Sequence, residues 1–368
     1  MMQQIDSPSG AHMVVDGRTI LNFGGCCYLG LSSEPELLEA AQFALRDQGP
    51  MGQLPRHYGF ALGANLDAEA AAAQFFGTDV AMYFSAGYLF GLIALVGLVQ
   101  MYDAIFIDEK AHYSLRDGAA ASGKPIYEFK HRDDADLALV MKKNLQSGQI
   151  PLVATDGMFP TFGSIPPLGS YMRLLDPHAG WLIVDESHSF GIIGPTGRGA
   201  VEEYGLPRQR VVAGGSMGKA FCAFGGIAVG TKTAIDAMWK SPAARGAATG
   251  MSCGAAMTAA SIRYVEQHPE LLKKLRENTG RLKAGIRTMG IEIENTDAPV
   301  VTFAKGSAAE MIHLQQQLFD EGILVFYSTY VGAGPNGVIR CAVFADHTPE
   351  DIDRLLATFS RNLLSINS

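Results

Sequence analysis

The hydrophobic residues in the first two thirds of the chain form short runs that alternate with longer stretches of helical composition. Seven runs are apolar along most of their length, so each predicts a strand that is buried on both faces. They are 80–85, 104–108, 126–129, 151–156, 181–185, 211–215 and 225–230. The helical stretches between most of them are 87–101, 112–121, 133–146 and 167–176. This alternation predicts an α/β fold with a mainly parallel seven-stranded sheet, and the short spacing of the last two runs is compatible with a mixed sheet there.

The pattern changes after residue 253. A long helical segment with apolar residues at helical spacing reaches about residue 289. It is followed by strand-like 299–304, a helix at 307–321, strand-like 323–327 and 337–344, and a last helix from about 348. We therefore predict an N-terminal segment at 1–50 that packs on both domains, a large domain at 51–253 and a small α+β domain at 254–368.

Composition and charge narrow the class of protein. The 368 residues are 48% hydrophobic and 18% charged, which allows a large core and argues against disorder. The net charge is −8, and no run of Lys or Arg marks a nucleic-acid groove or an anionic membrane surface. The five cysteines include no CxxC pair, so neither a disulfide framework nor a metal site is indicated. The N-terminus does not resemble a signal peptide, and no stretch spans a membrane comfortably, so we expect a cytoplasmic protein.

Polar residues follow two of the predicted strands, at the edge where open α/β sheets bind ligands. The run "YFSAGY" leads through Ser85 and Gly87 into a helix whose first amides suit a phosphate, although an ordinary turn is the simpler reading of this pattern alone. The run "LIVDESHSFG" ends a very apolar strand at Asp185, where a buried carboxylate needs a cationic partner. A protonated pyridine nitrogen would be such a partner. A capping role for Asp185 in the next turn accounts for the pattern equally well.

A single lysine lies in a glycine-rich, apolar loop after the strand at 211–215. The stretch "GGSMGKAFCAFGG" contains no acidic residue. It is not a P-loop, because Ala213 and Ala220 stand where that motif requires Gly and Ser or Thr. One possibility is an exposed lysine on a turn. The other is that burial lowers the pKa of Lys219 and favours the free amine that a Schiff base requires.

These three features are more informative together than separately. A helix N-terminus for a phosphate, an Asp for a ring nitrogen and a Lys for an aldehyde make up the protein side of pyridoxal 5′-phosphate (PLP) chemistry. A nicotinamide-binding enzyme is disfavoured, because no G-x-G-x-x-G motif follows an early strand.

Over nearly its whole length the chain resembles the α-oxoamine synthases, a family of fold-type-I PLP-dependent enzymes. The similar segments are "YLGLSSEPELLEAA", "FSAGY", "IDEKAHYSLRDG", "DESHSFGIIGPTGRGAVE", "GGSMGKAF" and "VIRCAVFADHTPEDIDRLL". The resemblance implies a PLP-dependent acyltransferase that condenses a small amino acid with an acyl thioester, from coenzyme A or an acyl-carrier protein, to an α-amino ketone with loss of CO₂. It also implies a homodimer whose site lies at the subunit interface.

The resemblance assigns a role to each candidate residue. Lys219 would bind the cofactor as a Schiff base and shuttle the substrate's α-proton, while Asp185 would pair with the pyridinium nitrogen. His188 would lie near the phenolic oxygen of the ring, and His112 would stack on the ring face. Arg340 would bind the amino-acid carboxylate with its planar guanidinium. The residues at the phosphate would be Ser85, Gly87, Tyr88 and Ser216.

The sequence departs from the family pattern in four places. Gly25-Cys26-Cys27 stands where the family commonly has Ser-Asn-Asn, and "FPTFGS" at 159–164 carries Pro and Phe in place of polar residues. Gly91 replaces the Asn that usually follows the phosphate turn. The segment from which the partner subunit often supplies a hydroxyl to the phosphate reads "ATGMSCGA", where Thr249 or Ser252 could take that role. These departures bear on which substrates fit.

Two other functions remain open from the sequence. One is an aminotransferase on the same fold, which would not require a thioester. The other is a non-catalytic partner subunit, which the intact Lys219, Asp185 and His112 disfavour.

Overall fold

The computed structural model describes residues 2–247 and 250–363, which separate into two compact units. The larger unit holds Glu34–Phe159 and Ile165–Gln267. The smaller unit holds the described residues of Met1–Ser33, Pro160–Ser164 and His268–Ser368. Helix α1 (Pro35–Gln48) packs against α10 (Ser252–Gln267), so residues on both sides of the predicted limits at 50 and 253 belong to the larger unit.

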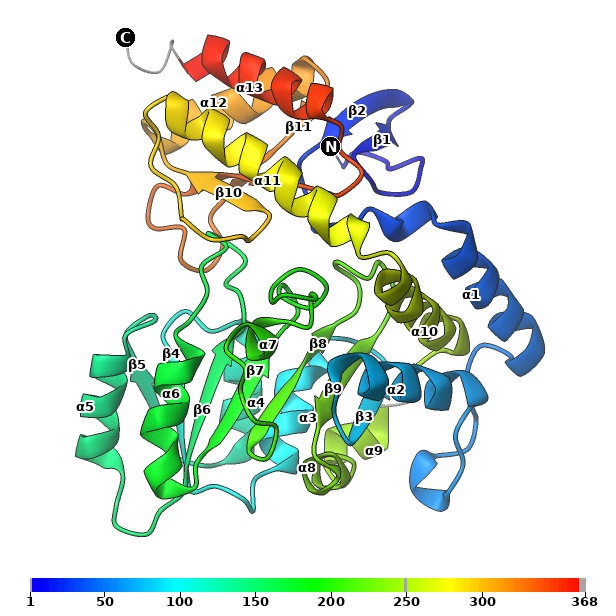
Figure 1. Ribbon diagram of the computed structural model, residues 1–368, viewed down its shortest axis with the longest axis vertical. Coiled ribbons are helices and arrows are strands. Elements are labelled where there is room, and N and C mark those ends of the chain that lie inside the picture. Colours follow the sequence, from blue (N-terminus) through cyan, green and yellow to red (C-terminus); the bar gives the residue numbers. More distant parts are fainter. Residues whose placement is uncertain (1, 248–249, 364–368) are drawn as a thin grey trace. The chain divides into compact units, whose positions relative to one another are not determined.

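A seven-stranded sheet forms the centre of the larger unit (Figure 1). Its order is β3 (Val80–Phe84), β9 (Gly226–Gly230), β8 (Val211–Ser216), β7 (Trp181–Asp185), β6 (Pro151–Asp156), β4 (Ala104–Asp108) and β5 (Ile126–Phe129). The neighbours from β8 to β5 are parallel, and β9 runs antiparallel to both β8 and β3. The seven predicted runs all form strands of this sheet, which confirms the predicted α/β fold and its mixed edge.

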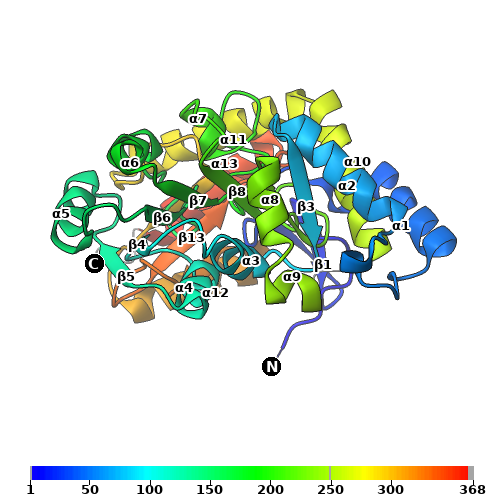
Figure 2. The same ribbon diagram turned by 90° about the horizontal axis from the view of Figure 1, so that it is seen from below.

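Helices cover both faces of this sheet. The remaining helices of the larger unit are α2 (Gly63–Phe76), α3 (Leu89–Gly97), α4 (Tyr113–Ser122), α5 (Asp134–Asn144), α6 (Leu168–Leu175), α7 (Ala200–Glu203), α8 (Lys232–Met238) and α9 (Pro242–Ala247). Figure 2 shows α3 and α4 on one face and α5 and α6 on the other. Alternate strand residues such as Ile105, Ile107 and Ile183 share one buried cluster with Phe90 and Leu115 from α3 and α4. The period of two places these strand side chains on the same face.

The smaller unit contains two three-stranded sheets and three amphipathic helices. The first sheet is β1 (His12–Val15), β2 (Arg18–Asn22) and β11 (Ile323–Leu324), and the second is β10 (Val300–Phe303), β13 (Val338–Ala342) and β12 (Phe326–Ser328). The helices are α11 (Glu270–Thr288), α12 (Ala308–Asp320) and α13 (Pro349–Leu363).

Two sequence predictions about individual elements are wrong. The run 323–327 is not one strand, because Ile323–Leu324 pairs with β2 whereas Phe326–Ser328 pairs with β13. The helix predicted to continue to about 289 is interrupted. Helix α10 ends at Gln267 and α11 begins at Glu270, because Pro269 has no N–H to donate to the preceding turn.

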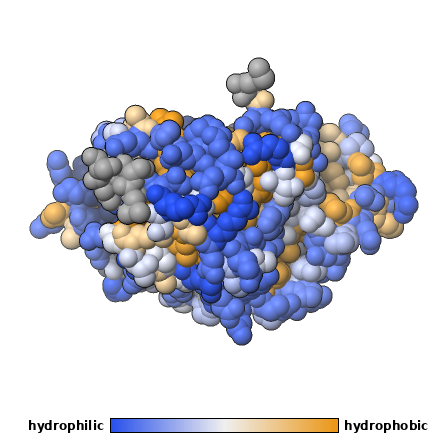
Figure 3. Space-filling model, turned by 90° about the horizontal axis from the view of Figure 1, so that it is seen from above, coloured by the Kyte–Doolittle hydropathy of each residue, from blue (hydrophilic) through white to orange (hydrophobic). Residues whose placement is uncertain are grey.

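Among the described residues, no helix is long and apolar enough to cross a membrane. On the face seen in Figure 3, hydrophilic side chains predominate and the hydrophobic ones lie in small scattered groups. Most of the large hydrophobic side chains are instead buried in the cores of the two units.

Candidate active site

Two acidic side chains lie side by side where strands β6 and β7 end. Asp156 and Asp185 are paired in the strand register, and each is only 3% exposed. Burial strongly raises the pKa of Asp156, and the neighbouring Asp185 raises it further. Both effects favour the protonated form of Asp156 over its carboxylate. Asp185 was predicted from the sequence and Asp156 was not, although both end a very apolar run.

The carboxylate of Asp185 receives its hydrogen bonds from neutral donors. Its Oδ1 accepts from the Ser187 N–H at 3.0 Å, and its Oδ2 accepts from the Ser114 hydroxyl at 3.2 Å. Neither bond supplies a compensating positive charge, although a buried carboxylate is costly without one. The site therefore fits a ligand that brings a cationic ring nitrogen to Asp185.

His112 lies next to this pair, at the residue that caps the N-terminus of α4. Its backbone N–H donates to Oδ2 of Asp156 at 2.9 Å, and its Nδ1 accepts from the Ser114 N–H at 3.1 Å. Burial lowers the pKa of His112, and Asp185 only partly opposes this effect. The imidazole is therefore neutral at physiological pH. The Tyr88 ring meets it edge-on, with 5.9 Å between the ring centroids.

Ser114 joins the two residues that the sequence analysis identified separately. Its Oγ lies 2.7 Å from Nδ1 of His112 and 3.2 Å from Oδ2 of Asp185. Ser114 lies in the family-like segment 107–118, but its sequence context predicted no role for it. Its position two residues after His112, at a helix start, is the signal that could have identified it.

The turn after β3 has the geometry of an anion site. The N–H groups of Leu89 and Phe90 donate to carbonyls within the turn at 3.0 Å each, whereas those of Gly87 and Tyr88 donate to no carbonyl in the part of the chain that the structure describes. A Cβ on Gly87 would lie 2.3 Å from Cβ of Ser216, so only glycine lets this turn approach the end of β8. Ser85 precedes Gly87 and is half-buried. The predicted phosphate residues in the turn after β3 thus lie next to the fourth, Ser216, at the end of β8.

Lys219 is half-buried on the loop between β8 and β9. Backbone hydrogen bonds from Met217 to Gly225 and from Ala223 to Met217, both 3.0 Å, close this loop. Burial has the largest effect on the pKa values of His112 and Asp156, and the charge of Lys219 also acts on both. Lys219 therefore shares one electrostatic environment with the carboxyl pair and the imidazole. His188 is buried in the turn that follows Asp185.

Arg340 lies in the smaller unit, on β13, and is only 8% exposed. Its guanidinium donates to the Pro160 carbonyl at 2.8 Å, the Gly25 carbonyl at 3.2 Å and the Tyr28 hydroxyl at 3.3 Å. These acceptors are neutral, so its charge remains available to an anion. Gly25 and Pro160 belong to the two segments that depart from the family pattern. Both departures therefore surround the residue predicted to bind the substrate carboxylate.

Thr249 and Ser252 were the two residues suggested to supply a hydroxyl to the phosphate bound by a partner subunit. Thr249 lies outside the described residues. The Ser252 side chain is buried, and its hydroxyl donates to the Gly49 carbonyl of the same chain.

A family model, similar sequences and similar solved structures all relate this chain to the same group of enzymes. Residues 19–359 match the model of the family Aminotransferase class I and II. The 8-amino-7-oxononanoate synthase of Symbiobacterium thermophilum is 30% identical, covering 98% of this chain and 92% of that protein, and that of Methylococcus capsulatus is 31% identical, covering 96% and 91%. Among solved structures, the serine palmitoyltransferase of Sphingomonas wittichii is 25% identical with a TM-score of 0.90, covering 99% of this chain and 92% of its own. A structure of SPT with a PLP internal aldimine is also 25% identical with a TM-score of 0.90, covering 100% and 93%.

Proposed function

We propose a reaction for this chain from one premise: the chain belongs to the class I and II aminotransferase family and, within it, to the α-oxoamine synthases. It is a PLP-dependent acyltransferase with the fold-type-I architecture. Its substrates are a small amino acid and an acyl thioester. Its product is an α-amino ketone, formed with loss of the amino acid's carboxyl group as CO₂.

The residues at the strand ends fit PLP. Asp185 would pair with the ring nitrogen, Lys219 would bind the aldehyde carbon, and His112 would lie against the ring. The phosphate would be held by the turn amides of Gly87 and Tyr88 with the hydroxyls of Ser85 and Ser216, and His188 would face the phenolic oxygen. When bound, PLP supplies an electron sink for negative charge at the α-carbon of the amino acid.

One observation carries this proposal. The buried carboxylate of Asp185 accepts hydrogen bonds from the neutral groups of Ser114 and Ser187, and it shares its site with Lys219 and a neutral His112. A structural aspartate of this depth is ordinarily matched by a cation of the protein itself. Here the cation is expected from the ligand.

Each side chain then has a defined task. The amine of Lys219 takes the α-proton of the amino acid at Nζ and later returns it. The carboxylate of Asp185 would pair with the protonated ring nitrogen, and Asp156 lies beside it. The guanidinium of Arg340 binds the substrate carboxylate, because its existing acceptors are neutral.

A homodimer is part of the proposal. The side chains of Leu38, Phe43 and Leu45 are exposed on α1, although all three are large and apolar. Exposed apolar groups of this kind are typical of surfaces that contact another protein. We assign α1 to the contact with a second copy of the chain. The cytoplasmic location expected from the sequence stays a prediction.

The experiment that tests the reaction is thiol release from a panel of acyl-CoA thioesters, with glycine, alanine or serine as the second substrate. We expect release that requires an amino acid and is abolished by Lys219→Ala. A change in the visible absorbance with an amino acid alone, without thiol release from any acyl-CoA or carrier-protein donor, would instead indicate an aminotransferase. Unchanged release by Lys219→Ala would contradict the proposed role of the lysine.

A further inference from the structure

Arg340 is held in place by a short segment from the middle of the sequence. Pro160–Ser164 belongs to the smaller unit, although the residues on both sides of it belong to the larger one. The Pro160 carbonyl accepts a hydrogen bond of 2.8 Å from Nε of Arg340. The proposed function assigns the amino-acid carboxylate to Arg340. Any group that fixes this segment therefore also fixes the guanidinium that would bind the substrate.

Threonine hydroxyls bind this segment to the rest of the smaller unit. Thr302 on β10 donates to the Thr161 carbonyl, and Thr161 itself donates to the Val331 carbonyl, both at 2.5 Å. Thr296 donates to the Gly163 carbonyl at 2.8 Å. Thr161 and Thr302 are each only 3% exposed, so water does not compete for their bonds. The position of the segment thus depends on these hydroxyl groups.

Thr302 stands directly opposite Arg340 in the sheet. Strands β10 and β13 pair antiparallel, and Thr302 is the register partner of Arg340. Directly opposed residues place their side chains on the same face of a sheet. Arg340 therefore reaches the Pro160 carbonyl from the face on which Thr302 reaches the next carbonyl, that of Thr161. Two neighbouring side chains hold two consecutive carbonyls, and the ring of Pro160 restricts the backbone between them further.

This arrangement determines which N–H groups of Arg340 can meet a carboxylate. Nε carries one hydrogen, and Pro160 accepts it. Each terminal nitrogen carries two hydrogens. Nη1 donates one to the Gly25 carbonyl at 3.2 Å, and Nη2 donates one to the Tyr28 hydroxyl at 3.3 Å. Cys26 lies beside the same guanidinium, but a thiol is only a weak acceptor. The fork formed by Nη1 and Nη2 is therefore the one that suits the two oxygens of a carboxylate.

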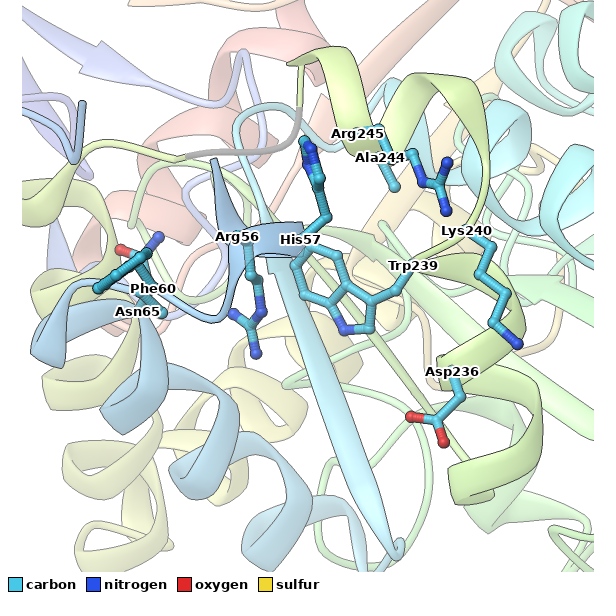
Figure 4. A pocket seen from close by; sticks show the side chains of 10 residues that line it. Arg56, His57, Phe60, Asn65, Asp236, Trp239, Lys240, Ala244 and Arg245 are labelled. Carbon is cyan, nitrogen blue, oxygen red and sulfur yellow. The ribbon is translucent and has the colours of Figure 1, made fainter. Parts of the chain in front are cut away.

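Arg56 shows a contrasting arrangement in the larger unit. It lines a cavity of about 350 Å³, where its guanidinium lies over the Trp239 ring, 4.1 Å from the centroid (Figure 4). Two hydrogen bonds of 2.7 and 2.6 Å join it to the carboxylate of Glu69. Glu69 thus neutralises Arg56, whereas the hydrogen-bond acceptors of Arg340 are uncharged. Of these two oriented guanidinium groups, Arg340 is the one that suits the carboxylate of a ligand.

We propose that Thr161 and Thr302 are positioning residues for the amino-acid substrate. They hold the Pro160 carbonyl against Nε of Arg340, so that the guanidinium presents Nη1 and Nη2 to the substrate carboxylate. Both threonines act through Arg340 and not on the substrate itself. The inference rests on the proposed function, because Arg340 has this task only if the chain binds an amino acid. Without either hydroxyl the segment can shift, and the fork is no longer held in the orientation that the carboxylate requires.

The first test measures amino-acid binding without acyl transfer. The PLP-loaded protein is titrated with alanine and with ethylamine, which is alanine without its carboxyl group, and the change in visible absorbance is followed. We expect wild-type protein to bind alanine more tightly than ethylamine. Thr302→Val and Thr161→Val should each weaken the binding of alanine by about tenfold and leave that of ethylamine unchanged. Equal weakening of both ligands, or of neither, would overturn the proposal.

Two further variants serve as controls for this titration. Thr302→Ser keeps the hydroxyl and should restore the wild-type affinity for alanine. Thr279→Val removes another buried hydroxyl of the smaller unit, one that donates to the Leu275 carbonyl within α11, and should change neither affinity. Because Thr161 and Thr302 are substituted separately, a variant that does not fold leaves the other to decide the question.

A double variant shows whether the threonines act through Arg340. Arg340→Ala should remove most of the preference for alanine over ethylamine, and adding Thr302→Val to it should weaken the binding of alanine no further. A further tenfold loss in the double variant would mean that Thr302 acts by another route, which contradicts the proposal. So would a wild-type protein that binds alanine no better than ethylamine, because Arg340 would then not bind the carboxylate.

Steady-state kinetics separate this inference from the proposed reaction. In the thiol-release assay, Thr161→Val and Thr302→Val should raise KM for the amino acid by about tenfold, with kcat and KM for the acyl thioester unchanged. A similar rise in KM for both substrates would indicate a general distortion and would contradict a positioning role. No thiol release from wild-type protein, together with a preference for alanine that Thr302→Val removes, would mean that the proposed reaction fails although the positioning role stands.

Discussion

Ser114 carries no reactive group, yet it connects the imidazole and the carboxylate of the candidate site. Its single hydroxyl proton can be donated to His112 or to Asp185, and its backbone N–H already fixes Nδ1 of His112. Removing the hydroxyl leaves His112 and Asp185 in place but removes the hydrogen-bonded bridge between them. The effect should therefore be on catalysis and not on cofactor retention.

We predict that Ser114→Ala lowers kcat/KM by roughly 10- to 100-fold, since a hydrogen bond to a charged group contributes about 1.5–3 kcal/mol. Visible absorbance of the bound cofactor should persist, and its dependence on pH should shift. Ser122→Ala, at the other end of α4, is the matched control and should behave as wild type. An unaltered kcat/KM for Ser114→Ala would show that the bridge has no catalytic importance.

His347 gives a prediction about stability in the smaller unit. Its ring is fully buried and stacks on Phe23 with 4.1 Å between centroids. Its Nδ1 accepts from the Phe344 N–H at 2.9 Å, and its Nε2 donates to the Asn22 carbonyl at 3.0 Å. Burial is the main cause that lowers its pKa to about 4. The unfolded chain has a histidine pKa of about 6.5, so below that pH the unfolded state binds a proton that the folded state does not.

Acidification therefore destabilises the fold through His347, between about pH 6.5 and pH 4. We predict a loss of about 2 kcal/mol of unfolding free energy from this group between pH 7 and pH 5. Urea unfolding at the two pH values measures it. The loss should be smaller by that amount in His347→Gln, and the exposed His313→Gln should keep the wild-type loss. The same loss in wild type and in His347→Gln would contradict the assignment.

Residues of the site divide into those that the sequence predicts and those that it cannot. Lys219 and Asp185 were identified because each stands out against an apolar run in its own segment. Asp156 and Ser114 act on residues far from them in sequence, and only the parallel register of β6 with β7 and the capped start of α4 bring these groups together. The roles of His188 and Arg340 remain predictions from the resemblance.

At the scale of elements, the contact between α3 and α4 positions His112. A Cβ on Gly91 would lie 2.1 Å from the Ser114 carbonyl oxygen, and one on Gly118 would lie 2.3 Å from the Gly91 carbonyl oxygen. The two glycines thus let the helices touch backbone to backbone. The asparagine that the family usually has after the phosphate turn could not occupy Gly91 in this packing.

We predict that Gly91→Ala destabilises the protein by about 3 kcal/mol, because the added methyl group must separate the helices. Urea unfolding measures this loss, and the activity that remains should fall as well. Gly280→Ala is the opposite case, since outside its own helix backbone no atom of the described residues lies within 4 Å of its Cβ position in α11. That substitution should stabilise by about 0.5–1 kcal/mol. A Gly91→Ala protein of wild-type stability would mean that the helix contact is loose.

The elements that the sequence predicted well are those whose burial is uniform. Strands covered on both faces give continuous apolar runs, and all seven of the central sheet were found. The β1–β2 hairpin and α1 are half exposed and give no such run. The switch between β11 and β12 was missed because adjacent residues of one apolar run, 323–327, pair with different sheets. Pairing partners are a property of the fold and not of a local pattern.

At the scale of the whole molecule, the exposed apolar side chains of α1 are the residues that we assign to a subunit contact. Phe43 is 57% exposed, and Leu38 and Leu45 lie exposed on the same helix. Helix α1 packs against α10, and the exposed Leu38, Leu45 and Phe43 lie on the two flanks of its buried stripe. A second copy of the chain is the partner that we assign to them, because the family resemblance implies a homodimer.

We predict that wild-type protein sediments as a dimer at micromolar concentration and that Phe43→Glu raises its dissociation constant by about 100-fold or more. A charge placed in an apolar contact loses its hydration and gains no partner there. Leu139→Glu, on the exposed side of α5, is the control and should leave the dimer intact. Activity of Phe43→Glu should fall in parallel with the dimer population if a partner subunit completes the site. Full activity in a protein that sediments as a monomer would show instead that each chain contains a complete site.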